Sequence, residues 1–293
     1  MKFKKRTLIV LLAVLVLGAL ALVGCTSSNS TDNTSSSTGT NSTTSSSTDS
    51  SSTATNDTSN PLNLVTPGKL TIGSDCDYPP FISLDNGQPA GFEYDLMSAI
   101  ADDMGLQLNY LAPQNFDTLV ASVSAGGKMD LAVSSLTITD EREQQVNFCI
   151  PYFDSNQAVV TLKTSPYTKA SDLDGKVIGA QSGTTGESWA IENLPNATMK
   201  NFNQTSEGLA ALQAGSIEAM IFDQPVADWQ VQNTYTNCQI IEVIPTGEQY
   251  GFAVSKDNPA LEDAVNASLQ KLIDNGTFAQ IFSKYFSYAP SID

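Results

Sequence analysis

The segment Ser134-Ser135-Leu136-Thr137-Ile138-Thr139-Asp140-Glu141-Arg142 indicates what kind of fold this chain adopts. It follows an apolar run, residues 129–133, that is typical of a buried strand. Asp140, with Glu143 three residues later, resembles a capping box at the start of a helix. The segment is therefore predicted to be a strand-to-helix turn that is rich in hydroxyl groups.

Arg142 is the candidate binding group of this turn, because the only other arginine is Arg6 near the N-terminus. A guanidinium is a planar fork that matches a carboxylate, and neighbouring hydroxyl and backbone N–H groups complete such a cradle. The turn is therefore predicted to grip the carboxylate of a small ligand. The alternative is that Arg142 is an ordinary surface cation in a charged helix start.

The elements before this turn predict an α/β arrangement. Residues 69–73 read as a strand, and a helix after Gly91, a strand over 106–112 and a helix over 116–123 lead to the strand 129–133. This order predicts right-handed βαβ crossovers and a parallel sheet, in which ligands bind outside the C-terminal strand ends.

The loop 74–81 leaves the first strand at the same sheet edge as the turn. Two prolines in this loop are expected to exclude regular structure. The loop would present Asp75, Asp77 and Tyr78 beside the turn.

The second half of the chain repeats the pattern of strands followed by helices. The turn Ser182-Gly183-Thr184-Thr185-Gly186 is expected to open a helix at Glu187, and such helix N-termini expose N–H groups that bind anions. A phosphate-loop interpretation fails because the GK[ST] ending is absent. Ser206 is the expected cap of a helix over 207–214. Asp223 ends a strand over 217–222, where it can cap the next helix and still meet a ligand.

Composition excludes several classes of function. The 293 residues carry a net charge of −17, which argues against nucleic acid or an anionic lipid surface as a partner. The chain has no histidine, so zinc sites and histidine-dependent nucleophilic catalysis lack a required residue. Cys76, Cys149 and Cys238 are an odd number, so at most one disulfide can form among them.

The N-terminus is predicted to be a secretory signal over residues 1–25, with a basic start and an apolar run. Its ending, Leu22-Val23-Gly24-Cys25, resembles the bacterial lipobox, which implies cleavage before Cys25 and lipid on its sulfur, with palmitate among the acyl groups. The alternative is an uncleaved membrane anchor. Removal of the signal would leave 10 cationic and 31 acidic residues, a net charge of −21. Residues 26–60 are almost entirely Ser, Thr and Asn, which predicts a disordered tether.

Five sequence blocks carry a resemblance to a known family. They are GSDCDYPPF, GFEYDLMSAIADDMG, NFDTLVASVSAGGKMDLAVSSLTITDEREQQVNF, DLDGKVIGAQSGTTGE and LQKLIDNGTFAQIFSKYF. In this order, over about residues 69–286, they resemble the polar-amino-acid group of bacterial extracellular solute-binding proteins, family 3, which serve ATP-binding-cassette importers. The resemblance implies an α/β, two-lobed, periplasmic-binding-protein-like fold (type II) with two hinge crossovers. Lobe 1 would be residues 64–155 and 248–293, and lobe 2 residues 156–247.

The resemblance also implies a ligand site between the lobes. Arg142 matches the carboxylate-binding arginine, Thr184 and Thr185 would contact the same carboxylate from lobe 2, and Asp223 would receive the ammonium group. The residues that match the family's site are Asp75, Tyr78, Phe116, Ser134, Ser135, Thr137, Arg142, Gln181, Thr184, Thr185 and Asp223.

The ligand's side chain would meet the remaining residues of this set. Tyr78 and Phe116 match the aromatic residues that sandwich it, although Tyr78 can also be a core residue. Asp75 would meet its distal end and favour a cationic or N–H-bearing group; alternatively, Asp75 caps its own loop. Gln181 stands where some relatives carry a basic or apolar side chain, and this leaves the amino acid open.

The resemblance implies a membrane-anchored, extracytoplasmic protein that binds a polar or basic amino acid of the lysine, arginine, ornithine, histidine or glutamine type. Its partners would be that free amino acid, the permease of an importer and the membrane through a lipid anchor. A monomer without cofactor, metal or enzymatic activity is expected. Two alternatives use the same scaffold: a dehydratase with Glu187 or Asp75 as the acid, and an amino-acid sensor.

Overall fold

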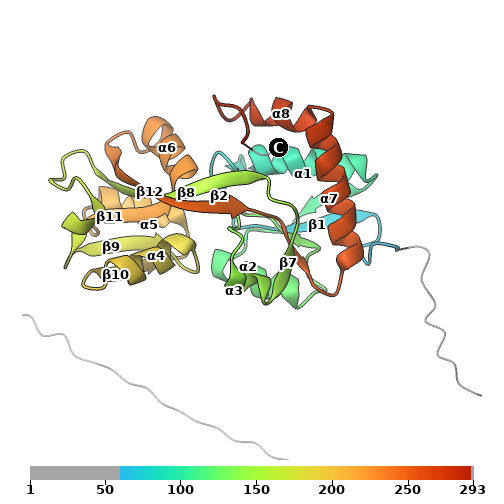
Figure 1. The fold of residues 1–293 in the computed structure, drawn as a ribbon, viewed down its shortest axis with the longest axis horizontal. Helices are drawn as coiled ribbons and strands as arrows, with labels where there is room; N and C mark the ends of the chain where they lie inside the picture. Colours follow the sequence, from blue (N-terminus) through green and yellow to red (C-terminus); the bar gives the residue numbers. More distant parts are fainter. Residues whose placement is uncertain (1–59, 292–293) are drawn as a thin grey trace, which may run out of the picture. The chain divides into compact units, whose positions relative to one another are not determined.

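Two five-stranded sheets organise the described part of the chain, and each sheet with its helices forms one lobe (Figure 1). The computed structural model describes residues 60–291. The predicted signal over residues 1–25, with Cys25, and residues 26–59 of the predicted tether lie outside the described residues. Among residues 60–291, no helix combines the length and apolar character that crossing a membrane requires.

Lobe 1 is built on the sheet with strand order β5-β1-β6-β13-β7, and a small sheet, β2-β3-β4, lies beside it. The first three strands are parallel, as predicted, but β13 pairs antiparallel with β6 and β7 because it re-enters the lobe from the opposite direction. The elements of lobe 1 are β1 (Lys69–Gly73), β2 (Asp77–Tyr78), β3 (Ile82–Asp85), β4 (Gln88–Ala90), α1 (Phe92–Asp103), β5 (Gln107–Tyr110), η1 (Phe116–Thr118), α2 (Leu119–Ser124), β6 (Leu131–Ala132), α3 (Asp140–Glu143), β7 (Val146–Phe148), β13 (Ala253–Ser255), α7 (Pro259–Asp274) and α8 (Thr277–Phe282).

Lobe 2 is built on the sheet with strand order β10-β9-β11-β8-β12. Helices α4 and α5 pack on β9 and β11, and α6 packs on β8, β11 and β12. The elements of lobe 2 are β8 (Phe153–Leu162), η2 (Ala170–Leu173), β9 (Val177–Gln181), α4 (Thr185–Asn193), β10 (Thr198–Phe202), α5 (Thr205–Gln213), β11 (Ala219–Asp223), α6 (Gln224–Asn233) and β12 (Cys238–Tyr250).

The two connections between the lobes are the start of β8 and the end of β12, and they pair with each other. Phe153 lies opposite Tyr250 and Ser155 opposite Glu248 in this antiparallel pair. A bridge between Thr137 and Tyr250 joins the pair to the turn 134–142. Both hinge segments are therefore held next to the turn that the sequence singled out.

Aromatic packing fixes lobe 1 and its junction with the hinge. Phe81 and Phe92 are fully buried, and their rings meet edge to face with centroids 6.1 Å apart. Phe81 also packs on Phe153 at 4.7 Å and on Tyr250 at 5.4 Å. One hydrophobic cluster joins these rings to Met220 and other core residues of lobe 2, so the hinge is a packed region as well as a pair of chain connections.

Several helix starts differ from the predicted ones. Thr139, not Asp140, is the N-cap of α3, and its side chain accepts a hydrogen bond from the N–H of Arg142. Ser206 lies inside α5, whose N-cap is Gln204. Asp223 occupies the N-cap position of α6 but its side chain makes no cap bond. Caps depend on which of several adjacent polar residues has an extended backbone, and sequence spacing alone does not decide this.

Regular structure also occurs where the sequence analysis excluded it. Asp77 and Tyr78 form the short strand β2, which pairs with Ser83 and Ile82 of β3. The two prolines follow this strand instead of interrupting it, so the prediction of a loop without regular structure was wrong for these two residues.

Gly91 supplies a specific test of the fold. Its φ is +127°, and a Cβ at this position would lie 2.4 Å from the carbonyl oxygen of Phe81. Gly91→Ala should therefore lower the free energy of unfolding by about 3 kcal/mol or more, because backbone strain and backbone overlap combine. Gly87→Ala is the matched control: Gly87 has φ +80° with nothing within 4 Å of its Cβ position, so about 1 kcal/mol is expected. Urea unfolding of both variants makes the comparison, and equal losses would contradict it.

Candidate ligand-binding site

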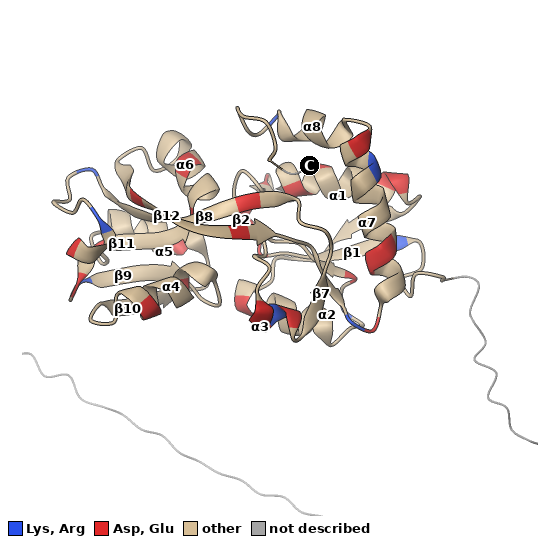
Figure 2. Cartoon of the chain, viewed as in Figure 1, with Lys and Arg blue, Asp and Glu red and all other residues tan. Residues whose placement is uncertain are grey.

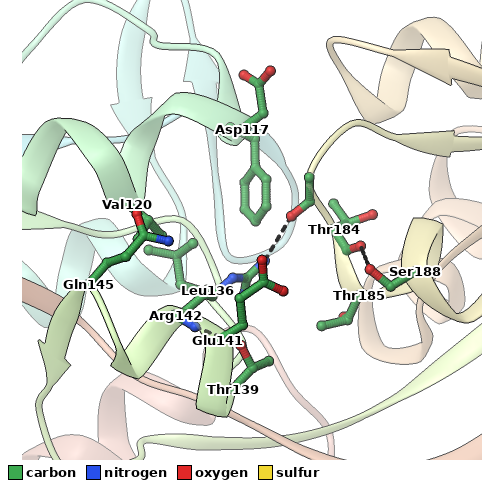
Figure 3. Close-up of a pocket in the computed structure, with 12 residues that line it drawn as sticks. Asp117, Val120, Leu136, Thr139, Glu141, Arg142, Gln145, Thr184, Thr185 and Ser188 are labelled. Carbon is green, nitrogen blue, oxygen red and sulfur yellow. Dashed lines mark hydrogen bonds between the residues drawn. The ribbon is translucent and has the colours of Figure 1, made fainter.

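A cavity of about 10 Å³ lies between the two lobes, and nine of the predicted site residues line it. A larger pocket of about 410 Å³ adjoins it and shares Phe116, Arg142, Thr184 and Thr185 with it. Figure 3 shows Thr184, Thr185 and Ser188 facing Arg142 and Glu141 across this larger pocket. The lining residues of the small cavity are Tyr78, Phe116, Ser135, Thr137, Arg142, Gln181, Thr184, Thr185 and Asp223.

Arg142 is half-buried in the first turn of α3 and connects the two lobes. One terminal nitrogen donates to the carbonyl oxygen of Thr137 at 2.6 Å, and the other donates to that of Gly183 in lobe 2 at 2.9 Å. Its Cζ atom lies 5.5 Å from the ring centroid of Phe116, which is a cation–π distance. The guanidinium is thus fixed in place while its remaining N–H groups stay available for an anion.

The N-terminus of α4 faces Arg142 from lobe 2. Thr184 is the N-cap, and its hydroxyl accepts a hydrogen bond from the N–H of Glu187 at 3.2 Å. The helix therefore begins at Thr185, two residues before the predicted start. An N-terminus with its unpaired N–H groups beside an arginine is a suitable environment for a carboxylate.

Two carboxylates, Asp223 and Glu248, are close enough to affect the electrostatics of Arg142. Burial lowers the pKa of Arg142, while the negative charges of Asp223 and Glu248 oppose this effect. Asp223, which is 6% exposed, accepts hydrogen bonds from Gln157 and from the hydroxyl of Tyr250. The site therefore combines one half-buried cation with two acids, of which Asp223 is buried and Glu248 is half-buried.

Glu248 was missed by the sequence analysis, although it is the residue at which the chain was predicted to return from lobe 2 to lobe 1. Its Oε2 accepts from Thr137 in lobe 1 at 3.1 Å, from Thr185 in lobe 2 at 3.0 Å and from Gln157 at 3.0 Å. One feature of the sequence could have identified Glu248: it is an acidic residue in a segment that was expected to connect the two lobes. Gln157 and Tyr250, which hold Asp223, were missed as well.

The pKa of Asp223 is raised to about 7. Burial is the main cause and the nearby Glu248 adds to it, whereas hydrogen bonds from Tyr250 and Gln157 oppose the rise. A carboxyl group in this environment gains from a cationic partner, because the cation stabilises the ionised form.

Asp75 and Ser134 do not line the cavity. Asp75 is 2% exposed and accepts hydrogen bonds from the hydroxyl of Ser134 at 2.6 Å and from the side chain of Gln181 at 2.9 Å. Burial raises the pKa of Asp75. Gln181 lies between Asp75 and the cavity, so contact of Asp75 with the ligand stays a prediction that requires Gln181 to move.

The donor groups of Ser135 are already in use, since both its N–H and its hydroxyl donate to Glu93 at 2.7 and 2.9 Å. The hydroxyl of Thr137 donates to Glu248. Tyr78 is buried, and its hydroxyl accepts the N–H of Asp223 at 3.1 Å across the lobes. Ser135 can therefore offer a ligand its carbonyl oxygen, because its N–H and its hydroxyl both donate to Glu93.

Within residues 60–291, no group of three or more Asp, Glu or Cys side chains is arranged to hold a metal ion. Cys76, Cys149 and Cys238 are buried free thiols in this part of the chain. Figure 2 shows acidic residues on both lobes, with α3 carrying its one basic residue among acidic neighbours.

The fold and the cavity together define the class of protein. This chain is a two-lobed binding protein of the periplasmic type, with its polar site between the lobes. The family model of bacterial extracellular solute-binding proteins, family 3, matches residues 70–288. The chain belongs to this family, and the prediction made from the sequence blocks is confirmed.

Individual relatives agree in length and in fold. The chain is 31% identical over 225 residues to ABC transporter arginine-binding protein 1 of Escherichia coli (strain K12), covering 74% of this chain and 90% of the relative. The structure of the arginine-, lysine-, histidine-binding protein ArtJ from Geobacillus stearothermophilus matches with a TM-score of 0.71 and 33% identity, over 77% of this chain and 98% of that one. The ancestral amino acid-binding protein AncCDT-1, a precursor of cyclohexadienyl dehydratase, matches with a TM-score of 0.68 and 32% identity, over 75% and 96% of the two chains.

Contacts between the lobes generate a prediction about their closure. Oδ2 of Asp77, in lobe 1, accepts the N–H of Ser206 at the start of α5 in lobe 2 at 2.8 Å, whereas the helix's own N-cap, Gln204, makes no side-chain cap bond. A cap contributes about 1 kcal/mol, so Asp77→Ala should shift the lobes toward separation by about fivefold. Energy transfer between dyes on the two lobes measures this shift.

The matched control is Asp85→Ala, which removes an exposed carboxylate of the β3–β4 hairpin that accepts from Asn86. Adding Gln204→Ser to Asp77→Ala should restore the helix cap without restoring closure, because the new cap lies in the same lobe as α5. An unchanged lobe distance in Asp77→Ala would contradict the prediction.

Proposed function

We propose that this protein is the substrate-binding lipoprotein of an ABC importer and that it binds a basic or polar L-amino acid between its lobes. The observation that carries the proposal is one guanidinium, Arg142, in the same cavity as Asp223 and beside Glu248. These charges complement the carboxylate and the ammonium of a free amino acid.

Each end of the ligand has a set of partners. The carboxylate meets Arg142 and the N-terminus of α4 with Thr184 and Thr185. The ammonium meets Asp223, Glu248 and the carbonyl oxygen of Ser135. Because the two sets come from both lobes and from the crossover strand, a bound amino acid stabilises the closed arrangement through contacts that an open form lacks.

The ligand class follows from acidic character near the cavity and from the relatives. Asp223, Glu248 and the deeper Asp75 make the site favourable for a cationic side chain and unfavourable for an acidic one. The similar proteins named above are arginine-binding and arginine-, lysine-, histidine-binding proteins. L-Arginine is therefore the first ligand to test.

Anchoring and transport complete the proposal. Residues 1–25 are proposed to be removed as a signal, with lipid on Cys25, and residues 26–60 to tether lobes 1 and 2 to the outer face of the membrane. The closed protein would be recognised by the permease of its importer.

A thermal-shift screen with the twenty amino acids plus ornithine, citrulline and cystine tests the ligand class, since a ligand that binds only the folded state raises the melting temperature. Stabilisation by none of them would reject the proposal.

A dehydratase is the second candidate, because one similar structure is a precursor of cyclohexadienyl dehydratase. The acids considered from the sequence, Asp75 and Glu187, do not line the cavity, whereas Asp223 does and has a pKa of about 7. A carboxyl group with such a pKa can act as a general acid. Turnover of prephenate or arogenate would support this candidate, and recovery of unchanged compound argues for binding alone.

Replacement of the arginine is the direct test of the carboxylate site. Arg142→Ala should weaken binding of L-arginine by roughly 10²–10³-fold or more, because a carboxylate left without its charged partner costs about 3–5 kcal/mol. Arg142→Lys is the matched variant, which keeps the charge but loses the planar fork, and should give an intermediate loss. Calorimetry measures both, and near-wild-type affinity of Arg142→Ala would remove Arg142 from the site.

The raised pKa of Asp223 predicts how binding depends on pH. Below about pH 7 Asp223 holds a proton, and a bound ammonium favours the carboxylate, so binding must release that proton. Affinity for L-arginine should therefore fall as pH is lowered below 7, by up to about tenfold per unit. Calorimetry in two buffers of different ionisation enthalpy counts the released proton.

Asp223→Asn should weaken binding and flatten this profile. Asp228→Asn is the matched control: Asp228 also has a raised pKa and lies on α6, outside the residues that line the cavity. A profile that stays flat in the wild-type protein would show that Asp223 does not receive the ammonium.

A further inference from the structure

Glu93 is a buried acid that the proposed site does not use. It is the second residue of α1 and is 0% exposed. Its Oε1 accepts three hydrogen bonds: from the N–H of Ser135 at 2.7 Å, from the hydroxyl of Ser135 at 2.9 Å and from the hydroxyl of Tyr152. One oxygen of Glu93 thus holds both donors of a residue that lines the ligand cavity.

The backbone of Ser135 explains why such a hold is needed. Its φ is +48°, in the left-handed region that residues other than glycine rarely adopt. A residue persists there only when its surroundings fix it. The two bonds from Ser135 to Glu93 are the fixing contacts, and they leave the carbonyl oxygen of Ser135 as its remaining polar group.

Tyr152 ties Glu93 to the hinge. It immediately precedes β8, its N–H donates to the carbonyl oxygen of Tyr250 at 3.0 Å, and its ring stacks on Phe252 with centroids 4.3 Å apart. Tyr152 is thereby fixed by both crossovers. Glu93 consequently has one partner in the turn and one at the hinge.

The protonation state of Glu93 does not decide these contacts. Burial raises its pKa to about 7, and hydrogen bonds from Tyr152 and Ser135 oppose the rise. Its other oxygen, Oε2, has no hydrogen-bond partner. Oε1 accepts these hydrogen bonds in either protonation state. The length of the side chain, rather than its charge, therefore determines whether Glu93 holds Ser135.

We propose that Glu93 is a positioning residue for ligand binding, which holds Ser135 in its left-handed conformation and so sets the turn 134–142 against the cavity. This inference rests on the proposed amino-acid function. It assigns to Glu93 no contact with the ligand.

Two conservative variants separate positioning from general stability. Glu93→Gln keeps the length and an acceptor oxygen but loses the charge, and it places an amide where Oε2 has no partner, so it should lower the melting temperature. Glu93→Asp keeps the charge, but its side chain is shorter by one methylene group, which moves the acceptor oxygen away from Ser135. With L-arginine as the probe, Glu93→Gln should bind within about threefold of wild type, and Glu93→Asp at least tenfold more weakly.

A glycine at position 135 tests the mechanism further. Ser135→Gly in the Glu93→Asp background should recover more than threefold in affinity, because glycine adopts positive φ without steric cost. Equal affinity of Glu93→Asp and wild type would overturn the inference, as would equal losses in the Asp and Gln variants or no recovery with glycine.

Exchange of the Ser135 amide hydrogen, measured by NMR without ligand, distinguishes failure of this inference from failure of the proposed function. The amide should be protected in wild type and in Glu93→Gln and exchange at least tenfold faster in Glu93→Asp. If no amino acid binds the wild-type protein, the proposed function fails while this comparison still tests Glu93. Equal exchange in all three proteins would overturn the inference whatever the ligand.

Discussion

The guanidinium of Arg142 is held by one backbone carbonyl oxygen from each lobe, Thr137 in lobe 1 and Gly183 in lobe 2. Its position is therefore fully defined only while the lobes touch. Two acids, Asp223 and Glu248, offset the cost of burying this cation. An amino acid carries one positive and one negative group, as the site does. It can therefore enter such a site by exchanging partners with groups that are already paired.

The hinge connects the lobes and also supplies a carboxylate, that of Glu248, to the site. Strand β12 pairs with β8 up to Ile244, and the register shifts before pairing resumes at Glu248. Irregularities of this kind redirect side chains, and here the carboxylate of Glu248 reaches Thr137 and Thr185 on opposite lobes. Movement at the hinge must therefore change the surroundings of Glu248, which contacts two residues that line the cavity, Thr137 and Thr185.

Local patterns predicted the order of strands and helices in lobe 1 and Arg142 as a binding group, whereas the two lobes and most of the cavity lining came from the family resemblance. In α7, apolar residues recur at the spacing of one helix face, and Leu261, Val265 and Leu269 of this face are buried. Residues whose roles depend on distant partners were not predictable in this way. Glu93 and Ser135 are 42 residues apart, and nothing in either local sequence indicates that they meet. The cap of α3 was misassigned for a related reason, because Thr139 and Asp140 are both good caps and only the backbone conformation separates them.

Asp75 shows how a residue outside the cavity can still influence which side chains are accepted. In the proposed function, a ligand's distal group would meet Gln181 first. The amide of Gln181 is bonded to Asp75, to the carbonyl oxygen of Asn203 and to Thr205. In the proposed function, a neutral side chain would leave this network intact and gain little from Asp75. A cationic side chain gains more by taking the place of the amide at Asp75, because a charge-assisted hydrogen bond is stronger than the neutral-donor bond that it replaces. An acidic side chain has no favourable arrangement here, since it would bring a second negative charge toward a buried carboxyl group whose pKa is already raised. In the proposed function, a preference for basic ligands would therefore depend on the depth of Asp75 and on displacement of the Gln181 amide from its hydrogen bond to Asp75.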